Sequence, residues 1–196
     1  IWNCHSGYEG ERQFNDAPMI NNKYITFGSF NNFRKINNDV IDVWSSILKK
    51  INNSKLILKA SDVAAVSKIS KEFEKKGVLN MVKFQPHTKN LNDHLNQYNN
   101  IDLALDTFPY NGVTTSFEAT WMGVPVLTMK GYNFNSRCGE SINKNLDLDE
   151  LIARNENDSL NIIEKSYSLH VPFHNQFVMI ERLIFRIIFL GILPKC

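Results

Sequence analysis

The turn at residues 111–115, Asn-Gly-Val-Thr-Thr, carries residue types that can bind a phosphate. Gly112 permits a tight turn, and Thr114 and Thr115 stand where a helix would begin. Their hydroxyls and backbone N–H groups, together with the positive end of the helix dipole, can hold a phosphate. Glu118, one helical turn later, can accept hydrogen bonds from ribose hydroxyls. The turn therefore predicts a nucleotide or nucleotide-sugar ligand, whereas helix capping, which needs no ligand, explains one threonine alone.

A lysine stands in the segment that follows the first predicted strand. Lys35 can reach over the edge of a sheet towards a phosphate, and Asn32 can donate its side-chain amide. The alternative is that Arg34 and Lys35 are solvated loop charges, as exposed basic residues usually are. Both interpretations remain open from the spacing alone.

His94 is a candidate contact for a nucleotide base. It shares a predicted helical face with Leu91, Leu95 and Tyr98, so it is either a core histidine or a ligand contact. Because this helix follows the third predicted strand, the ring could stack on a base, and Gln97 could pair with the base edge.

Strands alternate with helices through the middle of the chain, which predicts an α/β fold with a doubly wound parallel sheet. Such sheets bind ligands outside the carboxyl ends of their strands, so the loops that begin near Phe30, Pro86, Asp106 and Thr128 should form the site. The predicted strands cover residues 24–29, 55–59, 81–85, 101–105 and 124–129. The predicted helices cover residues 37–51, 63–76, 91–98, 115–122 and 149–154, with others that begin near residues 135 and 157.

Composition and missing motifs exclude several classes of protein. The net charge of +2 in 196 residues does not favour nucleic acid or an anionic membrane as partner. The three cysteines are far apart and odd in number, which is typical of free thiols in a reducing cytosol. There is no G-x-G-x-x-G and no Walker A lysine motif, which weighs against dinucleotide dehydrogenases and ATPases.

We expect no metal site. The acidic pair Asp147 and Asp149 matches a pattern that binds metal in some sugar transferases, but it is better explained as the start of a helix. His170 and His174 have a helical metal spacing, but Pro172 between them opposes a regular helix.

Residues 25–36, 93–98 and 102–128 together resemble the catalytic region of the protein O-linked N-acetylglucosaminyltransferase and SPINDLY family, in its bacterial, tetratricopeptide-linked form. Ser136-Arg137 and residues 151–153 continue the likeness. The resemblance implies a GT-B fold, in which two Rossmann-like halves enclose the active site, and it covers the second half only. Because the sequence begins with Ile1 rather than methionine, we expect a longer protein that also holds the first half, helical repeats and most acceptor contacts.

The resemblance implies an inverting transfer from a UDP-sugar, of N-acetylglucosamine or a related sugar, to protein serine or threonine hydroxyls. No metal and no other cofactor would be required. By position, Lys35 would be the catalytic residue that neutralises the departing diphosphate, with Asn32 nearby and with Thr114 and Thr115 on the phosphates. Val113 stands where animal enzymes have a histidine, so one phosphate donor is lost.

The same resemblance assigns the nucleoside end of the site. His94 would stack on uracil, and Gln97 stands where animal members place an arginine near the base. Glu118 replaces an aspartate that holds the ribose.

We therefore predict three segments: a linker from the missing half at residues 1–23, a UDP-sugar-binding Rossmann-like domain at 24–165, and an apolar helical tail at 166–196. The apolar run 177–193 is short and charged for a membrane span, so we expect it to pack on protein in a cytoplasmic enzyme. The alternatives are a non-catalytic nucleotide-binding or interaction module, a structural fragment that docks through its tail, and a GT-B enzyme for small molecules.

Overall fold

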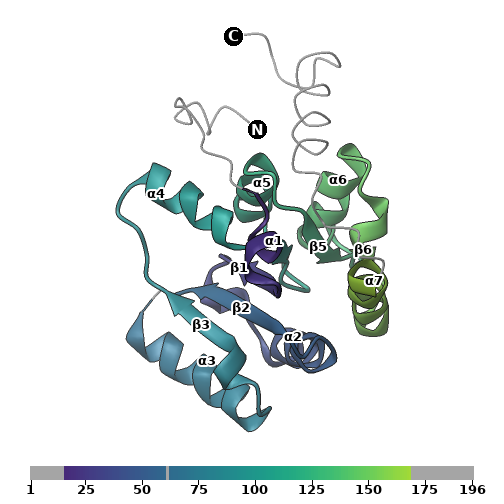
Figure 1. The fold of residues 1–196 in the computed structure, drawn as a ribbon. Helices are drawn as coiled ribbons and strands as arrows, with labels where there is room; N and C mark the ends of the chain where they lie inside the picture. Colours follow the sequence, from purple (N-terminus) through teal and green to yellow (C-terminus); the bar gives the residue numbers. More distant parts are fainter. Residues whose placement is uncertain (1–15, 61, 169–196) are drawn as a thin grey trace.

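A parallel sheet of six strands, in the order β3-β2-β1-β4-β5-β6, organises the computed structural model, which describes residues 16–60 and 62–168 (Figure 1). The strands are β1 (Ile25–Ser29), β2 (Ser54–Lys59), β3 (Val82–Gln85), β4 (Leu103–Leu105), β5 (Val126–Met129) and β6 (Ile152–Ala153). In the central register, Phe27 of β1 lies between Leu56 of β2 and Leu103 of β4. The predicted doubly wound parallel sheet is therefore confirmed.

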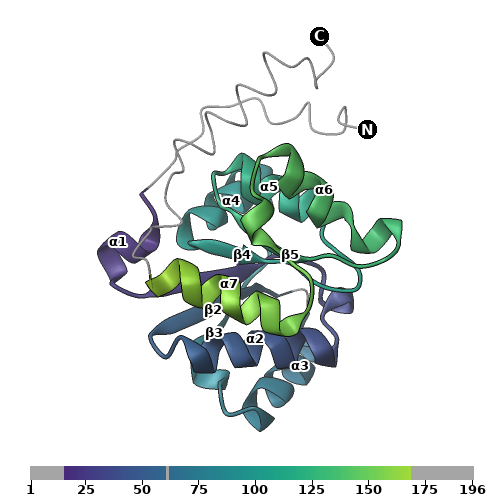
Figure 2. The same cartoon turned by 90° about the vertical axis from the view of Figure 1, so that its right-hand side faces the viewer.

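Helices cover both faces of this sheet (Figure 2). On one face lie α2 (Asn38–Lys50), α3 (Val63–Lys75) and α7 (Glu156–Ser168), and on the other α4 (Leu91–Asn96), α5 (Thr114–Trp121) and α6 (Cys138–Asn145). The larger apolar core is built around Phe27, Trp44 and Phe73, and a second core around Tyr98 and Met122 packs α4 and α5 against the sheet.

Local sequence signals set the helix ends. The side chains of Asn37 and Asp62 cap α2 and α3 by accepting hydrogen bonds from Val40 N and Ala65 N, at 2.8 Å and 2.7 Å. Gly77, with a φ of 72°, follows α3 in the left-handed region that favours glycine.

The strand order reverses between β1 and β4, which makes this place the topological switch point of the sheet. Doubly wound folds bind their ligands in the crevice outside the carboxyl ends of the strands at such a point. The segment after β1 contains the short helix η2 (Phe33–Lys35), and the loop after β4 leads into α5. Both segments singled out in the sequence therefore meet at the switch point.

Two sequence predictions were wrong in detail. Residues 149–154 do not form a helix, because η6 (Asp149–Leu151) leads directly into the sixth strand, which pairs with β5. The predicted linker 1–23 contains the short helix α1 (Pro18–Asn22), which begins with Pro18 and is followed by Lys23 in the left-handed region. The helix expected to begin near residue 135 is confirmed, since the single turn η5 (Phe134–Ser136) leads into α6, which begins at Cys138.

Several predictions fall outside the described residues. These are the linker before residue 16, the apolar tail from residue 169 onwards, and the histidine pair at 170 and 174. Within residues 16–60 and 62–168, no helix is long and apolar enough to cross a membrane.

Candidate functional site

Lys35 and the loop that precedes α5 are in direct contact. Lys35 Nζ donates a hydrogen bond of 2.9 Å to the main-chain oxygen of Asn111 and lies 4.4 Å from the centre of the Tyr110 ring. Arg34, beside it, is exposed, so only Lys35 is turned towards the switch point. The interpretation of Lys35 as a solvated loop charge is therefore wrong, because two contacts hold its ammonium group.

A second contact joins the same two segments. Thr115 Oγ1 donates a hydrogen bond of 2.9 Å to Oδ1 of Asn31, which is buried in the segment after β1. Gly112 makes this contact possible through its small size. A Cβ atom at this position would lie 2.5 Å from Thr115 Oγ1 and 2.9 Å from Asn31 Oδ1.

Neither threonine serves as a conventional helix cap. The residue before the first turn of α5 is Val113, and no side chain caps this helix end. Thr114 is exposed and Thr115 is half-buried. Because no side chain caps this end of the helix, the backbone N–H groups of its first turn stay available to a ligand. The alternative explanation, in which a threonine is present only to cap the helix, is therefore wrong for Thr115.

Asn32 holds the turn that carries Lys35. Its side-chain oxygen accepts a hydrogen bond of 3.0 Å from Arg34 N at the start of η2, and its side chain is exposed. The amide nitrogen of Asn32 can still donate to a ligand at this edge of the sheet.

Asp106 is a buried carboxylate beneath the site. Its Oδ1 accepts hydrogen bonds from Gly112 N at 2.6 Å and Thr107 N at 2.9 Å, and its Oδ2 accepts one from Thr128 Oγ1 at 2.8 Å. Burial raises the pKa of Asp106 to about 6, against these donors and the attraction of Lys35. Burial lowers the pKa of Lys35, and the negative charge of Asp106 opposes this decrease. Asp106 therefore supports the ammonium group electrostatically as well as holding the Gly112 turn.

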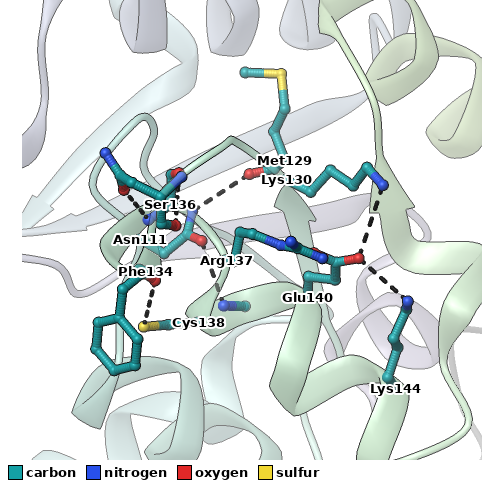
Figure 3. A network of polar contacts seen from close by, with 11 residues as sticks. Asn111, Met129, Lys130, Phe134, Ser136, Arg137, Cys138, Glu140 and Lys144 are labelled. Atoms are coloured by element: carbon teal, nitrogen blue, oxygen red, sulfur yellow. Dashed lines mark hydrogen bonds and ion pairs between the residues drawn. The ribbon is translucent and has the colours of Figure 1, made fainter.

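Asn111 links the loops around the phosphate end of the site and is fully buried (Figure 3). Its amide nitrogen donates to Thr107 O at 2.9 Å and Met129 O at 3.4 Å. Its side-chain oxygen accepts from Gly139 N at the start of α6, at 3.3 Å, and its main-chain N–H donates to Asn135 O at 2.9 Å. The main-chain oxygen that receives Lys35 is therefore held in a fixed place.

Glu140 anchors α6 beside this loop (Figure 3). Its carboxylate is buried and receives a hydrogen bond of 2.7 Å from Arg137 Nε, with Lys144 Nζ at 3.2 Å. The hydrogen bond from Arg137 is the main reason why the pKa of Glu140 is lowered. The Ser136-Arg137 motif thus has a structural role at the start of α6.

The nucleoside end of the predicted site forms a chain of polar contacts. His94 Nε2 lies 2.9 Å from Glu118 Oε2, which also accepts a hydrogen bond of 3.1 Å from the Tyr98 hydroxyl. On the other side of the ring, His94 Nδ1 lies 3.0 Å from Lys59 Nζ. Contacts therefore hold the half-buried His94 ring on both sides. His94 and Glu118 both lie at the edge of the sheet where the sequence predicted the site.

Gln97 is 7% exposed in the single turn η4 (Gln97–Asn100) and stands three residues after His94. Its Nε2 donates to Pro86 O at 3.2 Å, while its Oε1 is buried and has no hydrogen-bond partner among the described residues. A buried acceptor without a donor is costly, and a ligand N–H would relieve that cost.

No metal centre is found in the part of the chain that the structure describes, since no group of three or more His, Cys, Asp or Glu side chains is placed to hold an ion. Asp149 lies in the first turn of η6, which agrees with its interpretation as an acidic residue at the start of a helix.

A profile of glycosyl transferase family 41 matches residues 13–171, most of the chain. The chain belongs to glycosyl transferase family 41. The chain is 38% identical over 149 residues to a SPINDLY protein of Solanum lycopersicum, described as a probable UDP-N-acetylglucosamine–peptide N-acetylglucosaminyltransferase. The corresponding protein of Arabidopsis thaliana is 34% identical over 152 residues. Each match covers 72% of this chain and 16% of the relative, so the chain spans about 16% of the length of these family 41 proteins.

One solved structure agrees with the family 41 assignment, and a more distant one shares the fold. A mutant of the Thermobaculum terrenum O-GlcNAc transferase superposes with a TM-score of 0.76 at 30% identity, over 86% of this chain and 33% of that one. The pneumococcal O-GlcNAc transferase GtfA, in complex with UDP and GlcNAc, shares the fold with a TM-score of 0.55 at 10% identity, over 88% of this chain and 35% of that one. The fold is that of the GT-B glycosyltransferases.

The structure adds site residues that the sequence of this family 41 chain did not reveal: Asn31, Lys59, Asp106 and Tyr110. Asp106 and Lys59 stand directly after β4 and at the end of β2, so their place at the carboxyl edge of the sheet was a usable signal. Asn31 also follows the end of a strand, but nothing in the sequence links it to its partner Thr115, which is 84 residues away.

Proposed function

We propose that this chain is the donor-binding half of a glycosyltransferase that transfers N-acetylglucosamine, or a related sugar, from UDP to serine or threonine hydroxyls of proteins. The observation that carries the proposal is the meeting of Lys35 with the loop that leads into α5, through Asn111 O and through the contact of Thr115 with Asn31. One cation and one helix N-terminus at the same edge of a sheet suit a diphosphate. Family membership supports the reaction class, and the descriptions of the relatives support the sugar.

In this reaction, the bond between the anomeric carbon of the sugar and the diphosphate oxygen breaks, and UDP leaves with the electron pair. The negative charge that develops on the diphosphate is stabilised by the Lys35 ammonium and the N–H groups of the first turn of α5. Asn32 and the Thr114 hydroxyl add neutral donors, whereas the Thr115 hydroxyl donates to Asn31 Oδ1 and joins the two segments that hold the diphosphate. This set of donors supplies the stabilisation without a divalent ion.

The acceptor hydroxyl attacks the anomeric carbon from the face opposite to the leaving diphosphate, which inverts the configuration of the sugar. The acceptor and the remaining contacts are assigned to the part of the protein that completes the GT-B fold. The site described here binds and activates the donor.

The nucleoside is assigned to the chain of contacts at His94. The imidazole ring stacks on the base, and the unpartnered Oε1 of Gln97 accepts an N–H of the base edge. Glu118, held by His94 and Tyr98, lies on the helix that begins at the phosphates, where a carboxylate can accept from ribose hydroxyls.

Calorimetric titration of the chain with UDP, GDP and NAD tests the ligand class. We expect UDP to bind most tightly, Lys35→Ala to weaken it, and Lys83→Ala, an exposed lysine on β3, to leave it unchanged. Tighter binding of GDP or NAD would refute the donor assignment.

Transfer is tested in the protein that contains both halves, with UDP-N-acetylglucosamine and a serine-containing peptide. We expect glycosylated peptide with inverted configuration at the anomeric carbon, and equal rates with and without EDTA. UDP binding without transfer would favour the alternative of a non-catalytic nucleotide-binding module, and inhibition by EDTA would contradict the metal-free mechanism.

A further inference from the structure

Lys59 ends β2 at the edge of the sheet that carries the site, and its Nζ lies 3.0 Å from His94 Nδ1. An ammonium group has three hydrogen-bond donors and no acceptor. His94 Nδ1 must therefore accept this hydrogen bond, which means that Nδ1 carries no proton.

The other ring nitrogen then has a fixed role. With Nδ1 unprotonated, the ring proton lies on Nε2 and is donated to Glu118 Oε2, 2.9 Å away. The Tyr98 hydroxyl donates to the same oxygen at 3.1 Å. A neutral imidazole thus separates a cation from a carboxylate, and every hydrogen bond in the row runs towards Glu118.

The surroundings of the ring favour this arrangement. The rings of Phe30 and Tyr98 pack against His94, with centroids 6.2 Å and 5.6 Å away. The charged groups that contact the ring are Lys59 from β2 and Glu118 from α5. A proton on Nδ1 would point at the Lys59 ammonium, so the cation favours the tautomer that carries its proton on Nε2.

We propose that Lys59 is a positioning residue that fixes His94 as the neutral tautomer protonated at Nε2, and so orients the His94 ring and the Glu118 carboxylate for the nucleoside. The proton on one histidine nitrogen is set by the hydrogen bond that the other nitrogen makes. A ring that is already oriented loses less freedom when a base stacks on it. The nucleoside part of this inference rests on the proposed function, and the tautomer part does not.

Nitrogen-15 NMR of the full chain, labelled at histidine, tests the tautomer. Two-bond proton–nitrogen spectra distinguish a protonated ring nitrogen from an unprotonated one, and His94→Gln identifies the signals of His94. We expect an unprotonated Nδ1 and a protonated Nε2. In Lys59→Met, we expect the share of the tautomer protonated at Nε2 to fall, because no donor then faces Nδ1.

Two variants show whether the effect is specific. Lys59→Arg keeps a cation with donors only and should restore the wild-type pattern, which a purely structural loss would not do. Lys83→Met removes an exposed lysine from the neighbouring strand β3 and should change nothing. A proton on Nδ1 in the wild type, or an unchanged ring in Lys59→Met, would overturn the assignment.

Calorimetry with UDP on the same samples tests the consequence for binding. We expect Lys59→Met to weaken UDP binding about tenfold, with Lys59→Arg and Lys83→Met near the wild type. Equal affinity in Lys59→Met and wild type, with the ring pattern changed, would refute the positioning role. If wild type has the expected tautomer but does not bind UDP, the proposed function fails while the tautomer assignment stands.

Discussion

The Lys35 ammonium lies 2.9 Å from the main-chain oxygen of Asn111, in the loop that leads into α5. This contact joins the segment after β1 to the segment after β4, the two strands between which the order of the sheet reverses. A diphosphate at this point can touch the lysine and the first turn of α5 together. Substitutions in either segment can therefore test whether both segments bind the same diphosphate.

Replacing Lys35 by alanine should remove the charge that stabilises the leaving UDP. In the protein with both halves, we expect kcat to fall by about 100- to 1000-fold, as for loss of one donor to a developing negative charge. The fold should be unaffected, because Lys35 is half-buried at the end of η2 and not part of the apolar core. Initial rates and thermal melting measure the two effects.

Lys83→Ala is the matched control for Lys35→Ala, since it removes a lysine from the exposed surface of β3. Near-wild-type turnover in Lys35→Ala would remove Lys35 from the mechanism. A large drop in melting temperature would instead mean that its contacts with Asn111 and Tyr110 are structural.

Thr115→Val should weaken binding of the diphosphate while keeping the shape of the side chain. Valine lacks the hydroxyl that donates to Asn31 Oδ1 and so joins the loop that leads into α5 to the segment after β1. We expect UDP affinity to fall about tenfold, because the two segments that hold the diphosphate lose the hydrogen bond between them. Calorimetry measures it, and Thr115→Ser, which retains the hydroxyl, should bind nearly as wild type. Equal binding by the valine variant would show that the hydroxyl does not contribute.

The parts of the fold that sequence could predict are those fixed by local patterns. β1 is buried at every position, as a strand covered on both faces is, and its β-forming residues Ile25, Thr26 and Phe27 mark it in the sequence. β6 has only two residues and exists because Ile152 pairs with Thr128 of β5. Its sequence follows two acidic residues that are equally suited to a helix start, so only tertiary pairing decides its structure.

In the candidate site too, some residues could be proposed from local sequence patterns and others depend on tertiary contacts. Thr114 and Thr115 could be proposed because they begin the helix after β4, and Lys35 because it lies in the segment between β1 and α2. The role of Lys59 depends on a histidine 35 residues away on another element, and no motif marks that pair. The sequence singled out Gly112 for the tight turn, whereas the structure shows that its small size next to Thr115 matters.

Asn111→Ala should destabilise the fold as well as the site. The side chain is fully buried and makes hydrogen bonds to Thr107 O, Met129 O and Gly139 N, all of which would lose a buried partner. We expect a loss of about 3 kcal/mol in the free energy of unfolding, measured by urea denaturation. Asn32→Ala, which removes only the exposed cap of η2, should cost less than about 1 kcal/mol. Similar losses in both variants would contradict the linking role of Asn111.

Asp106 should make stability depend on pH. Burial raises its pKa from 3.8 to about 6, so the folded protein binds this proton more tightly than the unfolded chain does. Its contribution to stability is therefore present below about pH 4 and is lost as the pH rises through 6. The shift corresponds to about 3 kcal/mol between these limits. Urea denaturation at pH 4 to 8 measures it.

Asp106→Asn separates two effects of this residue. One is the cost in stability of burying a charged carboxylate, and the other is the effect of that charge on Lys35. An asparagine oxygen can accept from both Gly112 N and Thr107 N while its amide donates to Thr128 Oγ1, so the fold should be kept. We expect the variant to be more stable at pH 8, by up to about 3 kcal/mol, and to lose the decline between pH 4 and 6. Turnover should nevertheless fall, and its alkaline limit should move to lower pH, because the pKa of Lys35 loses the charge that raises it. Asp149→Asn, at an exposed acid, should change neither profile. An unchanged stability profile in Asp106→Asn would show that Asp106 is not the titrating group.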